Sequence, residues 1–200
     1  MISWDSFTSP VSLATVKGML GILQDDYDEV LADVHIPAAV EWAEGVTRRS
    51  IVARTHRWSF KQFPWPDMHD YSSSFKLPRG KTQSVESITY SYGGATTTLY
   101  GPSSSTPGTD WREDLGGDNG AILSPAYGRV WPITDWTDPQ PVLVTFTAGW
   151  TSSQLPAQFV HAIARYCGDA LAVAGATDIT ASTDLGAKDM LLMPWRLECA

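Results

Sequence analysis

Two stretches near the start of the chain repeat apolar residues at the three- and four-residue spacing of a helix. The first stretch follows Ser12, which is a suitable N-cap. The second covers residues 26–49, with Asp26 as the predicted N-cap and Glu29 as its capping partner. We predict a helix for each, and we expect Pro37 to bend or split the second because proline lacks a backbone donor.

From residue 51 the apolar period changes to two, which is typical of β-strands. Gly93-Gly94 lies between two alternating runs and predicts a two-residue hairpin loop. Residues 102–120 are rich in Ser, Thr, Pro, Gly and Asp and are predicted to form a long loop. Besides the run from residue 51, the predicted strands cover residues 73–77, 85–92, 96–100 and 142–148.

The end of the chain combines a helix with an apolar tail. Residues 156–174 carry a helical apolar stripe, with Pro156 in the first turn and Gly175 as a C-cap. Residues 177–185 are polar, and the sequence KDMLLMPWRLECA follows. The whole pattern predicts an α+β fold: a helical core from residues 1–50 and 151–175, an inserted antiparallel β-unit at 51–150, and an extended C-terminal arm at 176–200.

Composition narrows the class of protein. The 200 residues are 43% hydrophobic and 18% charged, which predicts a folded chain and excludes disorder over most of its length. No apolar run approaches the length of a membrane span, and the start lacks the pattern of a signal peptide, so we expect a soluble chain made in a cytoplasm and no membrane partner. The spacing of Cys167 and Cys199 fits neither zinc nor redox chemistry, and both are expected to be free thiols.

Charge is unevenly distributed along the chain. The formal net charge is −8, divided into net −7 over residues 1–47, +6 over 48–81 and −7 over the remainder. An acidic total argues against sequence-independent coating of DNA or anionic membrane. Consecutive blocks of opposite sign are compatible with complementary surfaces between packed copies, although a solvated mixture of charges is an equal alternative.

No constellation of catalytic residues is apparent. The four histidines are dispersed, and His69-Asp70 is an isolated pair that reads as a solvated loop. Residues 116–120 lack the spaced acids of a calcium loop and are predicted to form a hairpin turn. Motifs of serine hydrolases, P-loops and dinucleotide-binding folds are absent, so we expect no enzyme, cofactor or metal.

A basic stretch has two interpretations. Arg48, Arg49, Arg54 and Arg57 lie close in sequence to Trp58, a pattern that can bind nucleic acid through phosphate contacts and stacking. Because the net charge of the chain is negative, we favour packing of these arginines against the acidic block of a neighbouring copy.

Seven segments lie in a fixed order over nearly all of residues 10–197. They read PVSLATVKGML, AAVEWAEGVTRRSI, RTHRWSFKQFP, FKLPRGKTQSVESITY, VLVTFTAGW, LPAQFVHAIARY and MLLMPWRL. In these segments and their order the chain resembles the head–tail connector (adaptor) family of long-tailed phages and phage-like gene transfer agents.

The resemblance implies a structural protein that forms a dodecameric ring under a portal protein and contacts a tail-side connector or stopper protein. Such a ring is expected at the head–tail junction of the virion or phage-like particle, after synthesis in the host cytoplasm. DNA would pass through its channel without sequence-specific binding. A mainly acidic wall suits this passage because phosphates are repelled rather than held.

The C-terminal arm is the predicted attachment point. An apolar terminal segment is costly to leave in water, and by the same resemblance we expect it to dock on the portal. An alternative is that the arm folds back onto its own helices as core. The predicted portal-binding residues are Leu191, Leu192, Met193, Pro194, Trp195 and Arg196.

Two other function classes compete with the connector. A carbohydrate- or surface-binding β-module of a phage tail is the leading one, and a cluster of exposed tryptophans on one β-face would favour it. An enzyme is a more distant alternative, which a deep polar pocket would favour. The tryptophans that suggest the β-module are Trp65, Trp111, Trp131, Trp136 and Trp150.

Overall fold

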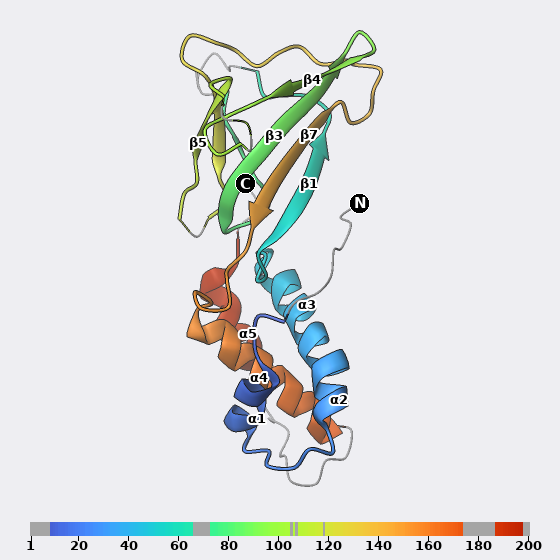
Figure 1. Ribbon diagram of the computed structural model, residues 1–200, viewed down its shortest axis with the longest axis vertical. Helices are drawn as coiled ribbons and strands as arrows, with labels where there is room; N and C mark the ends of the chain where they lie inside the picture. Colours follow the sequence, from blue (N-terminus) through green and yellow to red (C-terminus); the bar gives the residue numbers. More distant parts are fainter. Residues whose placement is uncertain are drawn as a thin grey trace. The chain divides into compact units, whose positions relative to one another are not determined.

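The computed structural model describes residues 9–65, 73–104, 106, 108–117, 119–173 and 187–197. The chain divides into two compact units (Figure 1): a helical unit that contains the described residues up to Val52 and from Trp150 onward, and a β-unit, Ala53–Gly149. The predicted α+β class is confirmed. Four sequence predictions lie outside the described residues: His69, Gly175, Cys199 and the polar stretch 177–185.

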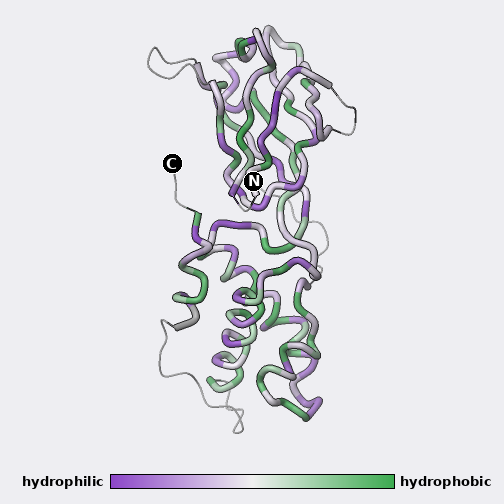
Figure 2. Tube along the Cα trace, turned by 90° about the vertical axis from the view of Figure 1, so that its left-hand side faces the viewer, coloured by the Kyte–Doolittle hydropathy of each residue, from purple (hydrophilic) through white to green (hydrophobic). Residues whose placement is uncertain are grey.

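The helical unit packs its helices around one apolar core. Val16, Leu31 and Ile163, from three different helical segments, are fully buried in it. Figure 2 shows hydrophobic and hydrophilic positions alternating along these helices, as expected for segments with one face on a core. The elements are α1 (Leu13–Leu20), α2 (Asp28–Val30), the π-helical η1 (Leu31–His35), α3 (Ile36–Thr47), α4 (Ala157–Val173), α5 (Ala187–Leu192) and the 3-10 turn η2 (Met193–Trp195).

The first helix begins and ends as its sequence dictates. The backbone N–H of Thr15 donates to Ser12 Oγ at 3.1 Å, which confirms the predicted N-cap. At the other end Gly21 adopts a positive φ of 70°, a conformation that costs glycine little. Local sequence therefore sets both ends of α1.

The predicted capping box of the second helix is wrong. Tyr27 occupies the N-cap position without a side-chain hydrogen bond, and α2 begins at Asp28 rather than after Asp26. The carboxylates here serve another contact, because Lys17 Nζ lies 2.7 Å from both Asp25 Oδ1 and Asp28 Oδ1. These hydrogen bonds raise the pKa of Lys17 and lower that of Asp25. The helix start is thus held by an ion-pair group from α1.

Pro37 changes the type of the second helix without breaking it. The segment α2–η1–α3 is continuous, and the π-helical turn η1 ends at His35, two residues before the proline. Within that turn Ile36 N–H donates to Leu31 O, five residues back. The wider π turn accommodates a ring that would crowd a regular α-helical turn.

The described residues of the β-unit form two antiparallel sheets. The larger sheet has strand order β1-β7-β3-β4 and the smaller has order β2-β6-β5. Val85, Phe146 and Leu123, from both sheets, are fully buried in one cluster, so the two sheets share a core. The strands are β1 (Arg54–Phe60), β2 (Phe75–Lys76), β3 (Thr82–Tyr92), β4 (Ala95–Leu99), β5 (Trp111–Asp114), β6 (Ile122–Pro125) and β7 (Val142–Ala148).

Turn predictions in this unit are confirmed, but the long loop is not. Gly93 and Gly94 have positive φ and connect β3 to β4, where Tyr92 pairs with Ala95. Gly116 and Gly117 also have positive φ and lie in the turn between β5 and β6. The predicted loop over residues 102–120 is wrong in part, because it contains strand β5.

The two segments through which the chain leaves and re-enters the helical unit are joined to each other. Trp150 N–H donates to Ile51 O at 3.1 Å, and an isolated β-bridge links Val52 with Trp150. Ile51 and Trp150 are also buried members of the helical core. The helical unit is therefore closed by its own contacts at the place where the chain leaves and returns.

Candidate functional site

The C-terminal segment, residues 187–197, packs onto the helical unit of its own chain. Its described part is helical, which differs from the extended conformation expected for an arm. Leu192 is 0% exposed in the core, and Leu197 N–H donates to Thr47 O at 3.0 Å. The ring of Trp195 lies 5.4 Å from that of Phe159. These contacts favour the folded-back alternative for Leu192 and Trp195.

Three of the other predicted portal-binding residues, Met193, Pro194 and Arg196, face outward. Met193 is 58% exposed, and Pro194 and Arg196 are also exposed. Leu191 is half-buried against the core. The segment therefore has an inner side that fixes it and an outer side that can meet a partner; its binding to a portal stays a prediction.

Arg49 contacts the segment directly. Its Nε donates to Trp195 O, and its guanidinium carbon lies 5.8 Å from the centre of the Trp195 ring. Only 5% of Arg49 is exposed. The charge pattern suggested packing between subunits, but this arginine makes contacts within its own chain.

The remaining arginines of the predicted packing set lie in different parts of the fold. Arg48 ends α3 with a positive φ of 57° and is exposed. Arg54 and Arg57 lie on β1, half-buried and exposed respectively. Arg48 and Arg57 are thus the members with the greatest surface exposure.

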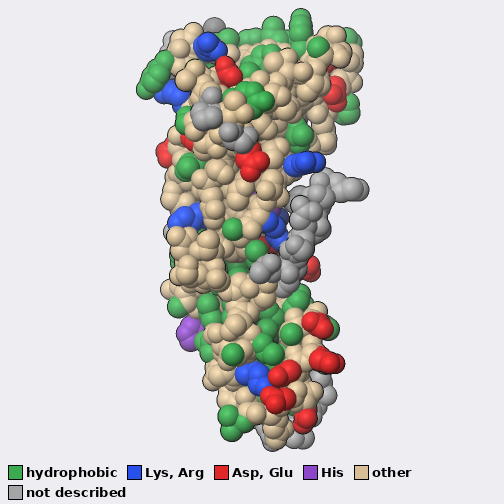
Figure 3. Space-filling model, in the orientation of Figure 1, with side chains coloured by type: hydrophobic (Ala, Val, Ile, Leu, Met, Phe, Trp, Pro, Cys, Tyr) green, Lys and Arg blue, Asp and Glu red, His purple; other side chains and the backbone are tan. Residues whose placement is uncertain are grey.

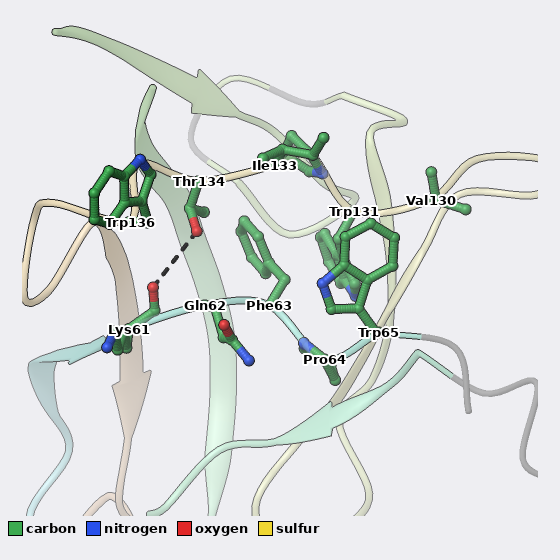
Figure 4. A pocket seen from close by; sticks show the side chains of 11 residues that line it. Lys61, Gln62, Phe63, Pro64, Trp65, Val130, Trp131, Ile133, Thr134 and Trp136 are labelled. Carbon is green, nitrogen blue, oxygen red and sulfur yellow. Dashed lines mark hydrogen bonds between the residues drawn. The ribbon is translucent and has the colours of Figure 1, made fainter. Parts of the chain in front are cut away.

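A second candidate site is an aromatic pocket in the β-unit. It has a volume of about 250 Å³ and is lined by residues 61–65, residues 130–134 and Trp136. Figure 4 shows Trp65 and Trp136 on opposite sides, with Phe63 between them. Trp65 is 68% exposed and Trp136 is 85% exposed. We refer to this site as the aromatic pocket.

Buried aromatic contacts fix the floor of the aromatic pocket. The rings of Phe63 and Trp131 are stacked at 4.8 Å with an angle of 6° between their planes. Trp131 Nε1 donates to Ser73 O at 2.5 Å, so the buried indole has its polar atom satisfied. Thr134 Oγ1 donates to Lys61 O at 3.5 Å, which connects the two lining segments (Figure 4).

The backbone on both sides of Trp136 is held by hydrogen bonds. Asp135 N–H donates to Ser91 O at 2.8 Å. Asp135 Oδ1 accepts from Thr137 N–H at 3.1 Å and from Thr137 Oγ1 at 2.7 Å, and these bonds lower the pKa of the carboxyl group. An exposed indole is therefore displayed on an ordered turn.

Three of the five tryptophans singled out from the sequence meet at this pocket. Trp111 and Trp150 do not, because they are buried in the β-unit and the helical core. Phe63, Val130 and Ile133 also line the pocket and were not predicted. Prolines next to Trp65 and Trp131 are the sequence signal that could have indicated loop-borne tryptophans.

Burial shifts the pKa values of two described side chains, His56 and Cys167. Burial, with Arg54 and Arg79 nearby, lowers the pKa of His56 to about 4, and its ring stacks on Phe146. Burial raises the pKa of Cys167, a free thiol as predicted, to about 12. Among the described residues no group of three or more His, Cys, Asp or Glu side chains could hold a metal ion. None of the helices within the described ranges is long and apolar enough to cross a membrane.

Comparison with known proteins gives a match by structure alone. No protein-family model and no curated protein matches the chain. A chain in the virion of a native gene transfer agent particle is similar with a TM-score of 0.70 and 19% identity. Chains in the neck of an empty particle with C6 symmetry and of a native particle with C12 symmetry are similar with TM-scores of 0.69 and 0.64, each at 18% identity.

These alignments are complete rather than local. Each covers 100% of this chain and 97% of the other chain. Both the helical unit and the β-unit are therefore included in the match. Over its whole length, the chain has the fold of chains found in gene transfer agent particles and their necks.

Proposed function

We propose that this chain is a structural component of the neck of a phage-like particle and acts there as a head–tail connector. The observation that carries the proposal is the fold similarity to neck chains, which extends over the whole of this chain. The C6 and C12 symmetries of those necks support a ring of copies. The proposed partners are a portal protein on one side and a tail-side connector or stopper protein on the other.

The chemistry of the described residues supports an assembly role rather than catalysis. His56 is buried and neutral at physiological pH, and Cys167 is buried and protonated. Neither is placed to act as a base or a nucleophile, because neither reaches the surface. The function proposed here depends on surfaces, not on a reactive group.

The charge distribution supports passage of DNA without binding. Figure 3 shows acidic side chains gathered over the α1–α2 region of the helical unit, where Asp25 and Asp28 surround Lys17. Acidic groups repel phosphates, so a ring of such units does not retain duplex DNA. The proposed ring therefore extends the DNA channel of the particle at the head–tail junction.

We assign portal contact to the outer side of the C-terminal segment. Leu192 and Trp195 hold the segment on the helical unit, and this positions Met193, Pro194 and Arg196 at the surface. An exposed methionine beside an arginine is a composition common at protein interfaces. Arg48 and Arg57 are the proposed contacts between neighbouring subunits.

Reconstitution with the portal protein of the same particle tests this function. We expect electron microscopy to show a defined ring of this chain on the portal. Met193→Asp should abolish attachment while the isolated chain stays folded, because the side chain is exposed. Leu23→Asp is the matched control, since Leu23 is a 95% exposed apolar residue outside the C-terminal segment. Absence of any complex with the unmodified chain would refute the connector function.

A further inference from the structure

We propose that the aromatic pocket of the β-unit binds a saccharide of neutral or acidic sugar rings. This activity is separate from the neck function and does not rest on it. It follows from the meeting of Trp65, Trp131 and Trp136 at one hollow of about 250 Å³. A hollow of this volume has room for a compact ring rather than a folded domain.

The two exposed indoles have the arrangement that a sugar requires. Trp65 and Trp136 lie on opposite sides of the hollow, and Phe63 lies between them (Figure 4). A pyranose presents apolar C–H groups on its faces, which pack on aromatic rings. Trp65 and Trp136 are both exposed, so a ligand can reach their side chains without any opening of the fold.

Polar groups at the same pocket match the hydroxyls of a sugar. The exposed Gln62 contributes an amide with both donors and acceptors, and Thr134 contributes a hydroxyl. The Nε1 atoms of exposed indoles also donate. A purely apolar partner would bury these groups without hydrogen bonds, which is costly. A saccharide packs its C–H groups on the apolar surface and also forms hydrogen bonds with the polar groups.

Charge restricts the class of sugar. Among the described residues that line the pocket, Lys61 is the sole charged side chain. The carboxylate of Asp135 is not among these lining groups and accepts hydrogen bonds from Thr137. An ammonium group attracts a carboxylate and repels another cation. We therefore expect neutral or uronic acid rings to bind and cationic amino sugars to be excluded.

The pocket is preorganised, which favours binding because few of its groups have to become ordered when a ligand binds. Phe63 and Trp131 are stacked in the floor, and the backbone around Trp136 is fixed through Ser91 and Thr137. A preorganised site loses less conformational entropy when a ligand binds. The floor of the pocket and its Trp136 side are thus presented in a defined geometry.

Isothermal titration of the full chain with four hexasaccharides tests the proposal. The probes are cellohexaose, chitohexaose, hexagalacturonate and the cationic hexamer of glucosamine. We expect at least one of the first three to bind and the cationic hexamer not to bind. Trp65→Ala and Trp136→Ala should each weaken binding by about tenfold or more, which corresponds to 1.4 kcal/mol. Lys61→Gln should weaken binding of hexagalacturonate but not of a neutral sugar.

Matched controls distinguish binding at this pocket from nonspecific binding and from the proposed neck function. Tyr127 is 85% exposed like Trp136 and lies in the β-unit outside the pocket, so Tyr127→Ala should leave binding unchanged. Thermal unfolding of each variant checks the fold. Failure of all three favoured probes overturns the proposal, as does an equal loss in Tyr127→Ala. If no sugar binds and the two tryptophan variants fail to join the portal ring, the pocket is a protein-docking site instead.

Discussion

The guanidinium of Arg49 lies over the indole of Trp195, 5.8 Å from the ring centre, and donates to the carbonyl of the same residue. These two contacts connect the end of α3 with a residue 146 positions later in the chain. They explain how a short terminal segment keeps a fixed place on the helical unit. Its outer surface is therefore held in a defined position on the helical unit.

Arg49→Lys should lower the free energy of unfolding. A lysine keeps the charge but loses the planar group that both donates through Nε and covers the indole. We expect a loss of about 1.5–3 kcal/mol, the range for hydrogen bonds of charged groups. Denaturant unfolding measures it. Arg196→Lys is the control and should change stability by less than about 0.5 kcal/mol because Arg196 is exposed.

Leu192→Ala should destabilise the isolated chain, whereas Met193→Ala should not. Leu192 is completely buried and its truncation leaves a cavity, so we expect a cost of about 2–5 kcal/mol. Met193 is exposed, so its truncation should cost less than about 0.5 kcal/mol. Thermal unfolding compares the neighbours directly. Equal stability of both variants would contradict the folded-back position of the segment.

Two glycine substitutions should have opposite effects. A Cβ at Gly101 would lie 2.3 Å from the buried indole of Trp111, so Gly101→Ala should cost about 1–3 kcal/mol or more. A Cβ at Gly45, within α3, meets nothing within 4 Å, so Gly45→Ala should stabilise by about 0.5–1 kcal/mol. Chemical denaturation gives both values. A stable Gly101→Ala would show that the contact with Trp111 is looser than described.

His56 should make the β-unit less stable in acid. The pKa of His56 is about 4 when folded and about 6.5 when unfolded, so the unfolded chain binds the proton more readily between these values. Its contribution is fully present above about pH 6.5 and is lost as the pH falls toward 4, by about 1–3 kcal/mol. Unfolding measured across this range should show a flatter slope in His56→Gln. Parallel slopes in both proteins would contradict this assignment.

Predictions from the sequence were most accurate for structural features that depend on residues close together in the chain. The cap at Ser12 and the hairpin at Gly93-Gly94 depend on neighbours in the chain, and both are confirmed. The short strand β5 was not predicted, for two reasons. Its pairing with β6 depends on the tertiary fold, and the charged residues Arg112–Asp114 are more typical of a loop than of a strand.

The candidate sites show the same limit. The sequence indicated an apolar tail and many tryptophans, but it could not show that Leu192 turns inward while Met193 stays exposed. It also could not separate the buried Trp111 from the exposed Trp136, since burial depends on which sheets pack together. Aromatic content alone therefore overestimates how many tryptophans reach a ligand.

The hydrogen bond between Trp150 N–H and Ile51 O has a consequence for protein engineering and for the evolution of the fold. Because the chain leaves and re-enters the helical unit at bonded positions, residues 53–149 can be exchanged as a cassette without opening the helical core. A helical unit joined across this point by a flexible linker should fold by itself. Evolution can exchange such a cassette and change the displayed surface while the helical scaffold is kept.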